Sequence, residues 1–213
     1  MSGLVDSILA NIGDDQVAAI ASRLGTDPAQ ARNAIENAIP LIVGGMAHNA
    51  SSAQGAGALH DALGAHAGFD VSSVLGNILG SGGLGGGGGL GAGTSGGGGI
   101  GGAILGHIFG ANRGAADQGL GQVTGLGQQN AGQLMAILAP IVMAYLANHV
   151  QSNGLNPGGL GGMLGQQSQQ IQQGGGLVGG LLNAVLNHGG GGNIDLSHLV
   201  SGAGGLLGAF SRR

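Results

Sequence analysis

The chain has 213 residues, of which 53 are glycine, 7% are charged and none is cysteine, so disulfides, thiolate metal sites and a thiol nucleophile are excluded. All five cationic residues are arginines, and Arg23, Arg32 and Arg113 stand alone while the other two end the chain. A surface that binds phosphates needs clustered Lys or Arg, so this composition also argues against a nucleic-acid partner.

Two short helices are predicted at the N-terminus from the helical spacing of apolar residues. The first spans residues 3–12 and the second spans 14–24. Asp14 is expected to cap the start of the second helix with its carboxylate, and Gly25 is expected to end that helix as a left-handed cap residue.

The strongest helix start in the chain is Asp27-Pro28, where the aspartate provides the cap and the proline takes the first helical position. The helix that begins there is predicted to run to about residue 49. Pro40 lies inside this helix and should kink it, because proline donates no backbone hydrogen bond and clashes with the preceding turn. The pair Gly44-Gly45 follows and should allow another backbone to approach closely.

The rest of the chain alternates glycine-rich stretches with apolar helical segments. Residues 80–102 contain 16 glycines, and glycine loses more backbone entropy on ordering than any other residue, so we expect a disordered linker at 80–99. Further on, Gly102, Gly106 and Gly110 are expected to allow tight helix packing. The other predicted elements are helices at about 54–63 and 71–79, an apolar segment at 104–110, a helix at about 115–126, a turn at 127–130 and a long helix to about 151.

Two segments a hundred residues apart, 38–49 and 138–149, are apolar helices with a proline inside each. A proline in a helix interior costs about 3 kcal/mol, so its recurrence in the same apolar frame indicates two related units. Aligning Leu24-Gly25 with Leu126-Gly127 requires one two-residue gap before the proline. We expect the two helices to pack together as a central pair, with a core of Ile39, Leu41, Ile42, Val43, Leu134, Ile137, Leu138, Ile141, Val142 and Leu146.

The predicted fold class is all-α, a multi-helical array of two related half-repeats, 3–79 and 100–151, joined by the glycine-rich linker. Together these form one helical domain over 1–151. Residues 152–213 are a Gly- and Gln-rich tail with short helices, and the pattern leaves open whether this tail packs on the array. The longest unbroken apolar run, 134–147, is shorter than the roughly 20 residues of a membrane span, so it predicts a buried core helix.

A family resemblance supports this fold class. The motif Ile104-Leu105-Gly106-His107-Ile108-Phe109-Gly110, followed by Leu138-Ala139-Pro140-Ile141-Val142, resembles the bacterial family called domain of unknown function 937, which is related to the YidB-like proteins. Ala38-Ile39-Pro40-Leu41-Ile42 and Gly57-Ala58-Leu59-His60 are similar to the first half of the same family. The resemblance covers about residues 1–150 and implies an all-helical array, with no established activity, cofactor or catalytic residues to transfer.

Patterns that suggest catalysis lack the surroundings that the chemistry needs. The sequence around Ser95 matches the nucleophile elbow Gly-x-Ser-x-Gly, but no strand is predicted before it and no helix directly after it. His60 and Asp61 are adjacent in the sequence, but we do not expect them to act as an acid–base pair, because adjacent side chains on a helix point apart. A Walker loop needs lysine, which is absent, and no strand precedes the glycine patterns. We therefore expect no enzyme, no catalytic residue and no cofactor.

The seven histidines do not have metal-ligand spacing, because no two lie four residues apart on one helical face. His60 and His66 are six residues apart, while His48 and His149 fall near equivalent positions of the half-repeats. His107 is expected at the edge of the core, with one ring nitrogen bonded to a backbone carbonyl. The unrepeated, imperfect calcium-type nonapeptide Gly189–Ser197 is discarded, so we expect no metal.

The expected function is that of a non-enzymatic structural or interaction protein that forms homo-oligomers. A surface with so few charged residues repels its own copies weakly, which favours self-association. Asp6, Asp14 and Asp15 give the N-terminus the wrong charge for a secretory signal, so we expect a cytoplasmic protein. The alternative is a peripheral envelope or membrane-associated factor, motivated by the apolar stretches in 177–210. Neither reading identifies a protein partner.

Overall fold

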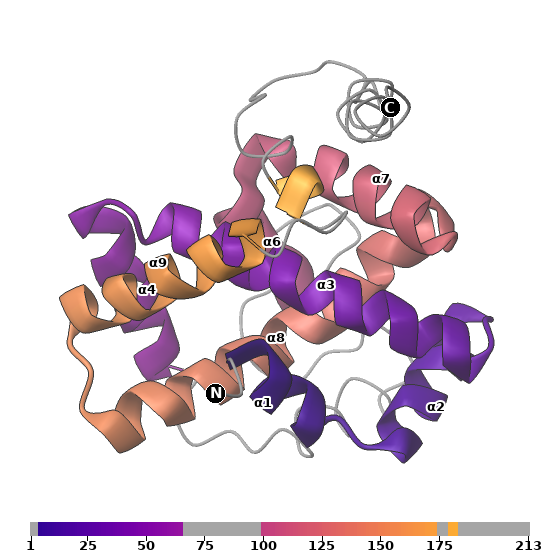
Figure 1. Ribbon diagram of the computed structural model, residues 1–213, viewed down its shortest axis with the longest axis horizontal. Helices are drawn as coiled ribbons and strands as arrows, with labels where there is room; N and C mark the ends of the chain where they lie inside the picture. The colour runs from indigo at the N-terminus through magenta and orange to yellow at the C-terminus, as the bar shows by residue number, and fades with distance from the viewer. Residues whose placement is uncertain (1–3, 66–98, 174–178, 183–213) are drawn as a thin grey trace, which may run out of the picture.

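The computed structural model describes residues 4–65, 99–173 and 179–182, and this part of the chain is helical with short connections (Figure 1). The predicted all-α class is confirmed. The predicted helix at 71–79 and the linker, apart from Gly99, lie outside the described residues. The helices are α1 (Leu4–Asn11), α2 (Asp14–Leu24), α3 (Pro28–Asn49), α4 (Ala53–Ala65), α6 (Gly99–Phe109), the 3₁₀ helix η1 (Gly110–Asn112), α7 (Arg113–Thr124), α8 (Gly127–Asn153) and α9 (Pro157–Gln173).

The start of α3 is set by the predicted cap. The carboxylate of Asp27 accepts a hydrogen bond from the backbone N–H of Gln30 at 2.9 Å, and Pro28 takes the first helical position. The preceding helix, α2, ends as predicted at Gly25, whose φ of +66° is left-handed. Its start differs from the prediction: Gly13 is the N-cap, and Asp14 is the first helical residue without a capping hydrogen bond.

The connection between α7 and α8 begins with a left-handed glycine, as does the connection between α2 and α3. Gly125 ends α7 with φ +72°, and α8 then begins at Gly127, so the turn predicted at 127–130 is wrong. Gly25 and Gly125 each lie 15 residues before the proline of the following helix, Pro40 or Pro140. With these caps matched, the two segments align without the two-residue gap that the sequence pattern required.

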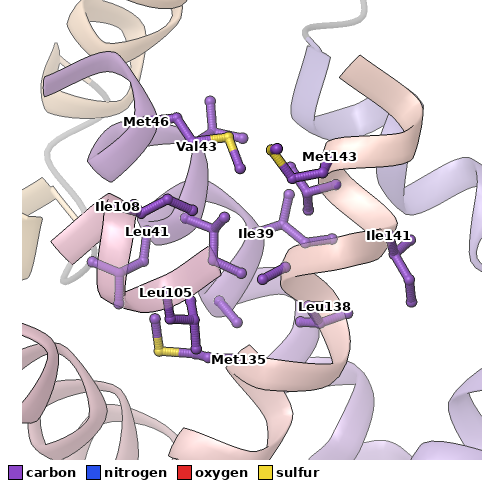
Figure 2. Close-up of a cluster of buried hydrophobic side chains, with 14 of the residues drawn as sticks. Ile39, Leu41, Val43, Met46, Leu105, Ile108, Met135, Leu138, Ile141 and Met143 are labelled. Atoms are coloured by element: carbon purple, nitrogen blue, oxygen red, sulfur yellow. The ribbon is translucent and has the colours of Figure 1, made fainter. Parts of the chain in front are cut away.

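The core lies between α3 and α8, which pass through the middle of the array and contact each other (Figure 1). All ten predicted core residues are at most 1% exposed, so the expected central pair is confirmed. Figure 2 shows Ile39 and Leu41 of α3 and Leu138 of α8 within this cluster, with Leu105 and Ile108 added by α6. The described residues bury no polar or charged residue, so the interior is held by apolar packing.

Glycines let neighbouring elements approach the core helices. A Cβ atom on Gly45 of α3 would lie 2.7 Å from a methyl carbon of Ile108 and 2.8 Å from the ring of Phe109. The predicted approach of another backbone is therefore wrong, because side chains make the close contacts at this pair. In α6 the tight contact is at Gly101, where a Cβ would lie 1.8 Å from the carbonyl oxygen of Ala136. The glycines that were predicted to allow tight helix packing, Gly102, Gly106 and Gly110, do not do so.

Those three glycines face other surroundings. A Cβ on Gly102 would meet only the guanidinium of Arg113, and neither Gly106 nor Gly110 has a neighbour within 4 Å of that position. Gly110 instead has a left-handed φ of +54° at the junction between α6 and α7. The regular spacing of the three residues therefore does not mark a packing face.

The helix α9 extends the array beyond the boundary predicted at residue 151. It lies within the segment predicted as a tail, and it packs on α3 and α4 (Figure 1). Leu160 and Leu164 are its fully buried residues, one helical turn apart, while Gln166 and Gln170 are exposed. An apolar edge on an otherwise Gly- and Gln-rich helix is enough to dock it.

Candidate functional site

Several candidate segments lie outside the residues that the structure describes. These are the serine motif around Ser95, the second histidine of the pair His60 and His66, and the nonapeptide Gly189–Ser197. The expectations about them stay predictions.

His60 of α4 holds a structural hydrogen bond. Its Nε2 lies 3.2 Å from the backbone carbonyl oxygen of Leu155, in the turn that follows α8, while Asp61 is exposed. A cavity of about 300 Å³ lies beside this contact. Its lining is His60, Leu63, Gly64, Ala147, Val150, Gln151, Gly154 and Leu155. With His60 and Gln151 on otherwise apolar walls the cavity can hold an apolar group, but its lining has no second titratable side chain for acid–base chemistry.

His107 is placed differently from the prediction. It is exposed, so the expected position at the edge of the core is wrong. Its backbone carbonyl accepts a hydrogen bond from the side-chain amide of Asn49 at 3.3 Å, which ties the end of α6 to the end of α3. The apolar neighbours Ile104, Leu105 and Ile108 turn inward, and the imidazole lies on the opposite side of the helix.

The histidines near the ends of the two long helices are not brought together by any contact in the described chain. His48 is exposed, whereas the ring of His149 is stacked on Tyr145, with centroids 6.4 Å apart and planes within 10°. Among residues 4–65, 99–173 and 179–182, no group of three or more His, Asp or Glu side chains is arranged to hold a metal ion. These two histidines therefore form no metal site with their described neighbours.

An open cleft of about 500 Å³ lies between α2 and the start of α3. Asp14, Asp15 and Arg32 are at its rim, and Arg32 and Asp14 form an ion pair there. The two side chains are 51% and 89% exposed, so water screens the pair and it contributes little to stability. The cleft has charge at its edge and no buried polar group to orient a ligand.

The sequence pattern did not indicate one partly buried carboxylate, Asp117 of α7. Its side chain is 14% exposed, its Oδ1 is buried without a hydrogen-bond partner, and its Oδ2 lies 3.7 Å from Nε of Arg113. Burial raises the pKa of the Asp117 carboxyl, and the positive charge of Arg113 partly opposes this rise. Arg113 also donates to the carbonyl of Gly102 at 3.1 Å, so the pair connects α7 to α6.

A groove that the sequence pattern did not indicate receives the helical turn Gly179–Leu182. Leu181 and Leu182 are 4% and 0% exposed. A Cβ on Gly119 of α7 would lie 2.1 Å from a methyl carbon of Leu181, and one on Gly44 of α3 would lie 2.5 Å from a methyl carbon of Leu182. Carbon atoms pack at about 3.5–4 Å, so the two leucines fit only because both positions are glycine. We call this site the glycine groove.

These features define the class of protein: an all-α array whose core is a pair of long, proline-containing helices, with apolar clefts on its surface. A family profile described as a bacterial protein of unknown function, DUF937, matches residues 6–149. The protein belongs to this family, which confirms the resemblance seen in the sequence. No curated protein and no solved structure gives a significant match.

Proposed function

We propose that the protein is a non-enzymatic structural protein that self-associates through its uncharged C-terminal half. The observation that carries this proposal is the charge distribution: no Asp, Glu, Lys or Arg occurs from Gln118 to Ile194. This stretch includes α8 and the surface helix α9, whose exposed face is glutamine. Copies that meet through such a surface experience no charge repulsion, and glutamine amides can donate and accept hydrogen bonds between identical faces.

We also propose that the array consists of two half-repeats. Support comes from positions a hundred residues apart, where Ile20 matches Leu120, Ala31 matches Ala131 and all four residues are 0% exposed. The order of a helix, a left-handed glycine and a long helix with an internal proline occurs in both halves. A shorter helix, α4 or α9, follows each long helix, and α9 lies beyond the bound of 151 predicted for the second half-repeat.

Sedimentation of the purified full chain tests the self-association. We expect the mass to rise above the 20.2 kDa of one chain with increasing protein concentration, and to do so at high salt as well. The variant Gln166→Glu/Gln170→Glu adds two charges to the exposed face of α9 and should weaken association. The matched control, Ala18→Glu/Ser22→Glu, adds them to exposed positions of α2. A strict monomer at every concentration would contradict the proposal.

The alternative proposal, a peripheral membrane protein, is tested by flotation with liposomes. Among the described helices, α8 is the one that is long and apolar enough to span a membrane. In the structure, 72% of its most apolar stretch is buried against other helices, as in the core of a globular protein. Protein that stays at the bottom of the gradient supports the self-associating scaffold, and flotation supports the alternative. The cytoplasmic location stays a prediction.

A further inference from the structure

The turn Gly179–Leu182 is a small element with its own binding site. It contributes two buried leucines, and the glycine groove that receives them is formed by α3 and α7, neither of which directly precedes the turn. Five residues separate the turn from the end of α9. The position of a Cβ on Gly179 would be 2.9 Å from the carbonyl oxygen of Ile171, so the turn begins beside the end of α9.

This arrangement has the geometry of an exchangeable element. A short connection between two packed elements is a common hinge for exchange of one element between identical chains. Exchange requires no new contact, because the turn of one copy makes in its partner the contacts that it makes in its own chain. The surrounding stretch, 118–194, carries no charge that would keep two copies apart.

We propose that the glycine groove is a self-association site, in which Leu181 and Leu182 of one copy insert beside Gly44 and Gly119 of a second copy. Each copy then completes the site of the other. This inference rests on the proposed self-association and names the surface that produces it. The partner is a second copy of this chain, recognised by a pair of leucines on one helical turn.

The sequence offers a matched control for this pair of leucines. Residues 71–79 and 178–186 have apolar residues at the same spacing. The positions a hundred residues from the groove glycines are Ala19 and Ala144, so the pair of glycines is not repeated at those positions. The residues that match in the two segments are Val71, Val74, Leu75, Ile78 and Leu79 in the first and Val178, Leu181, Leu182, Val185 and Leu186 in the second.

Two full-length variants test the glycine groove and the turn separately. Gly119→Leu fills the groove and leaves the turn intact, whereas Leu181→Ser/Leu182→Ser removes the leucines and leaves the groove intact. Circular dichroism verifies that each variant is folded, and Gly44→Ala blocks the groove from the other helix if Gly119→Leu does not fold. By sedimentation, we expect each variant alone to have the mass of one chain, 20.2 kDa.

Mixing the two variants is the decisive measurement. One intact groove then meets one intact turn, so the mixture should form a 1:1 complex of twice the monomer mass. The control Val74→Ser/Leu75→Ser should associate as the native chain does.

Each other outcome contradicts the exchange through the glycine groove, the proposed self-association, or both. If the single variants associate as the native protein does, the glycine groove is not the interface, while the proposed self-association stands. If the single variants are monomers and the mixture is too, the turn serves only its own chain and exchange is wrong. If the native protein is a strict monomer, this inference and the proposed function both fail.

Discussion

The two long helices bury the same positions with side chains of different size. Residue 38 is alanine in α3 and its counterpart in α8 is Leu138, whereas for Ile39 and Ala139 the large and small residues are reversed. All four side chains are 0% exposed. Burial therefore follows the position along the helix, while the size of each side chain fits the neighbours that surround it.

The helices also differ after their prolines. Gly44 and Gly45 leave space on α3 for Leu182 and for side chains of α6, whereas α8 has Ala144 and Tyr145 at the corresponding positions. Tyr145 is half-buried and stacks on a residue of its own helix, His149. The first long helix is thus a surface that receives other elements, and the second fills the corresponding space with its own side chains.

The largest expected effect comes from truncating the core on either side. Leu138→Ala and Ile39→Ala each remove buried methyl groups, and each should lower the free energy of unfolding by about 2–5 kcal/mol. Urea denaturation followed by circular dichroism measures the loss, with the exposed change Gln129→Ala as control. Similar losses in the free energy of unfolding would support the equivalence of the two helices, and a loss confined to one of them would contradict it.

A smaller effect is expected where α3 receives α6. Gly45→Ala places a methyl group against Ile108 and Phe109, and such overpacking costs about 1–3 kcal/mol, less the gain from replacing glycine in a helix. The matched control is Gly57→Ala in α4, where nothing lies within 4 Å and a gain of about 0.5–1 kcal/mol is expected. Thermal denaturation compares the two. A stabilised Gly45→Ala variant would show that α3 is not a receiving surface.

The starts of the long helices differ as well, because α3 has a side-chain cap and α8 has none. Asp27→Ala removes that cap and should cost about 1 kcal/mol, while Asp27→Asn retains an acceptor and should cost a few tenths. At the corresponding start of α8, Gln128→Ala should change the midpoint of thermal unfolding little. Equal effects at residues 27 and 128 would contradict the assigned role of the cap.

The features that depend on residues close together in the sequence were predictable. The cap at Asp27, the bounds of α3 and the ten core residues follow from the helix-start signal and apolar periodicity, which act within a few residues. The docking of α9 was not predictable, because Leu160 and Leu164 lie among glycines and glutamines that weaken the apolar pattern. Whether so narrow an edge is buried depends on the helices that meet it.

The candidate sites were harder to predict because tertiary packing selects among similar residues. Gly101 contacts α8 closely, whereas the better-spaced Gly106 faces open space, and His107 is on the outer side of the same helix. The buried Asp117 could have been found from the alignment itself. With Gly25 and Gly125 matched and no gap, its counterpart is a core valine.

Asp117 of α7 is a charged residue at a position where α2 has an apolar one. Val17, a hundred residues earlier in α2, is 4% exposed, whereas the Asp117 carboxylate is partly buried beside Arg113. Because burial raises the pKa of Asp117 above its ordinary value of 3.8, the folded protein binds this proton more tightly than the unfolded chain. The contribution of Asp117 to stability is therefore most favourable below that ordinary value and is lost as the pH rises through the raised pKa.

Removing this charge is the smallest predicted change. Asp117→Asn should raise the free energy of unfolding near neutral pH by less than about 1 kcal/mol, the size of an ordinary net hydrogen bond, because no charge is then buried. The gain should shrink as the pH is lowered toward 3.8, where the native carboxyl is protonated in the fold. Urea midpoints of both proteins across this range measure it, with the exposed Asp61→Asn as control. A loss of stability at neutral pH would mean that the charge of Asp117 stabilises α7 through Arg113.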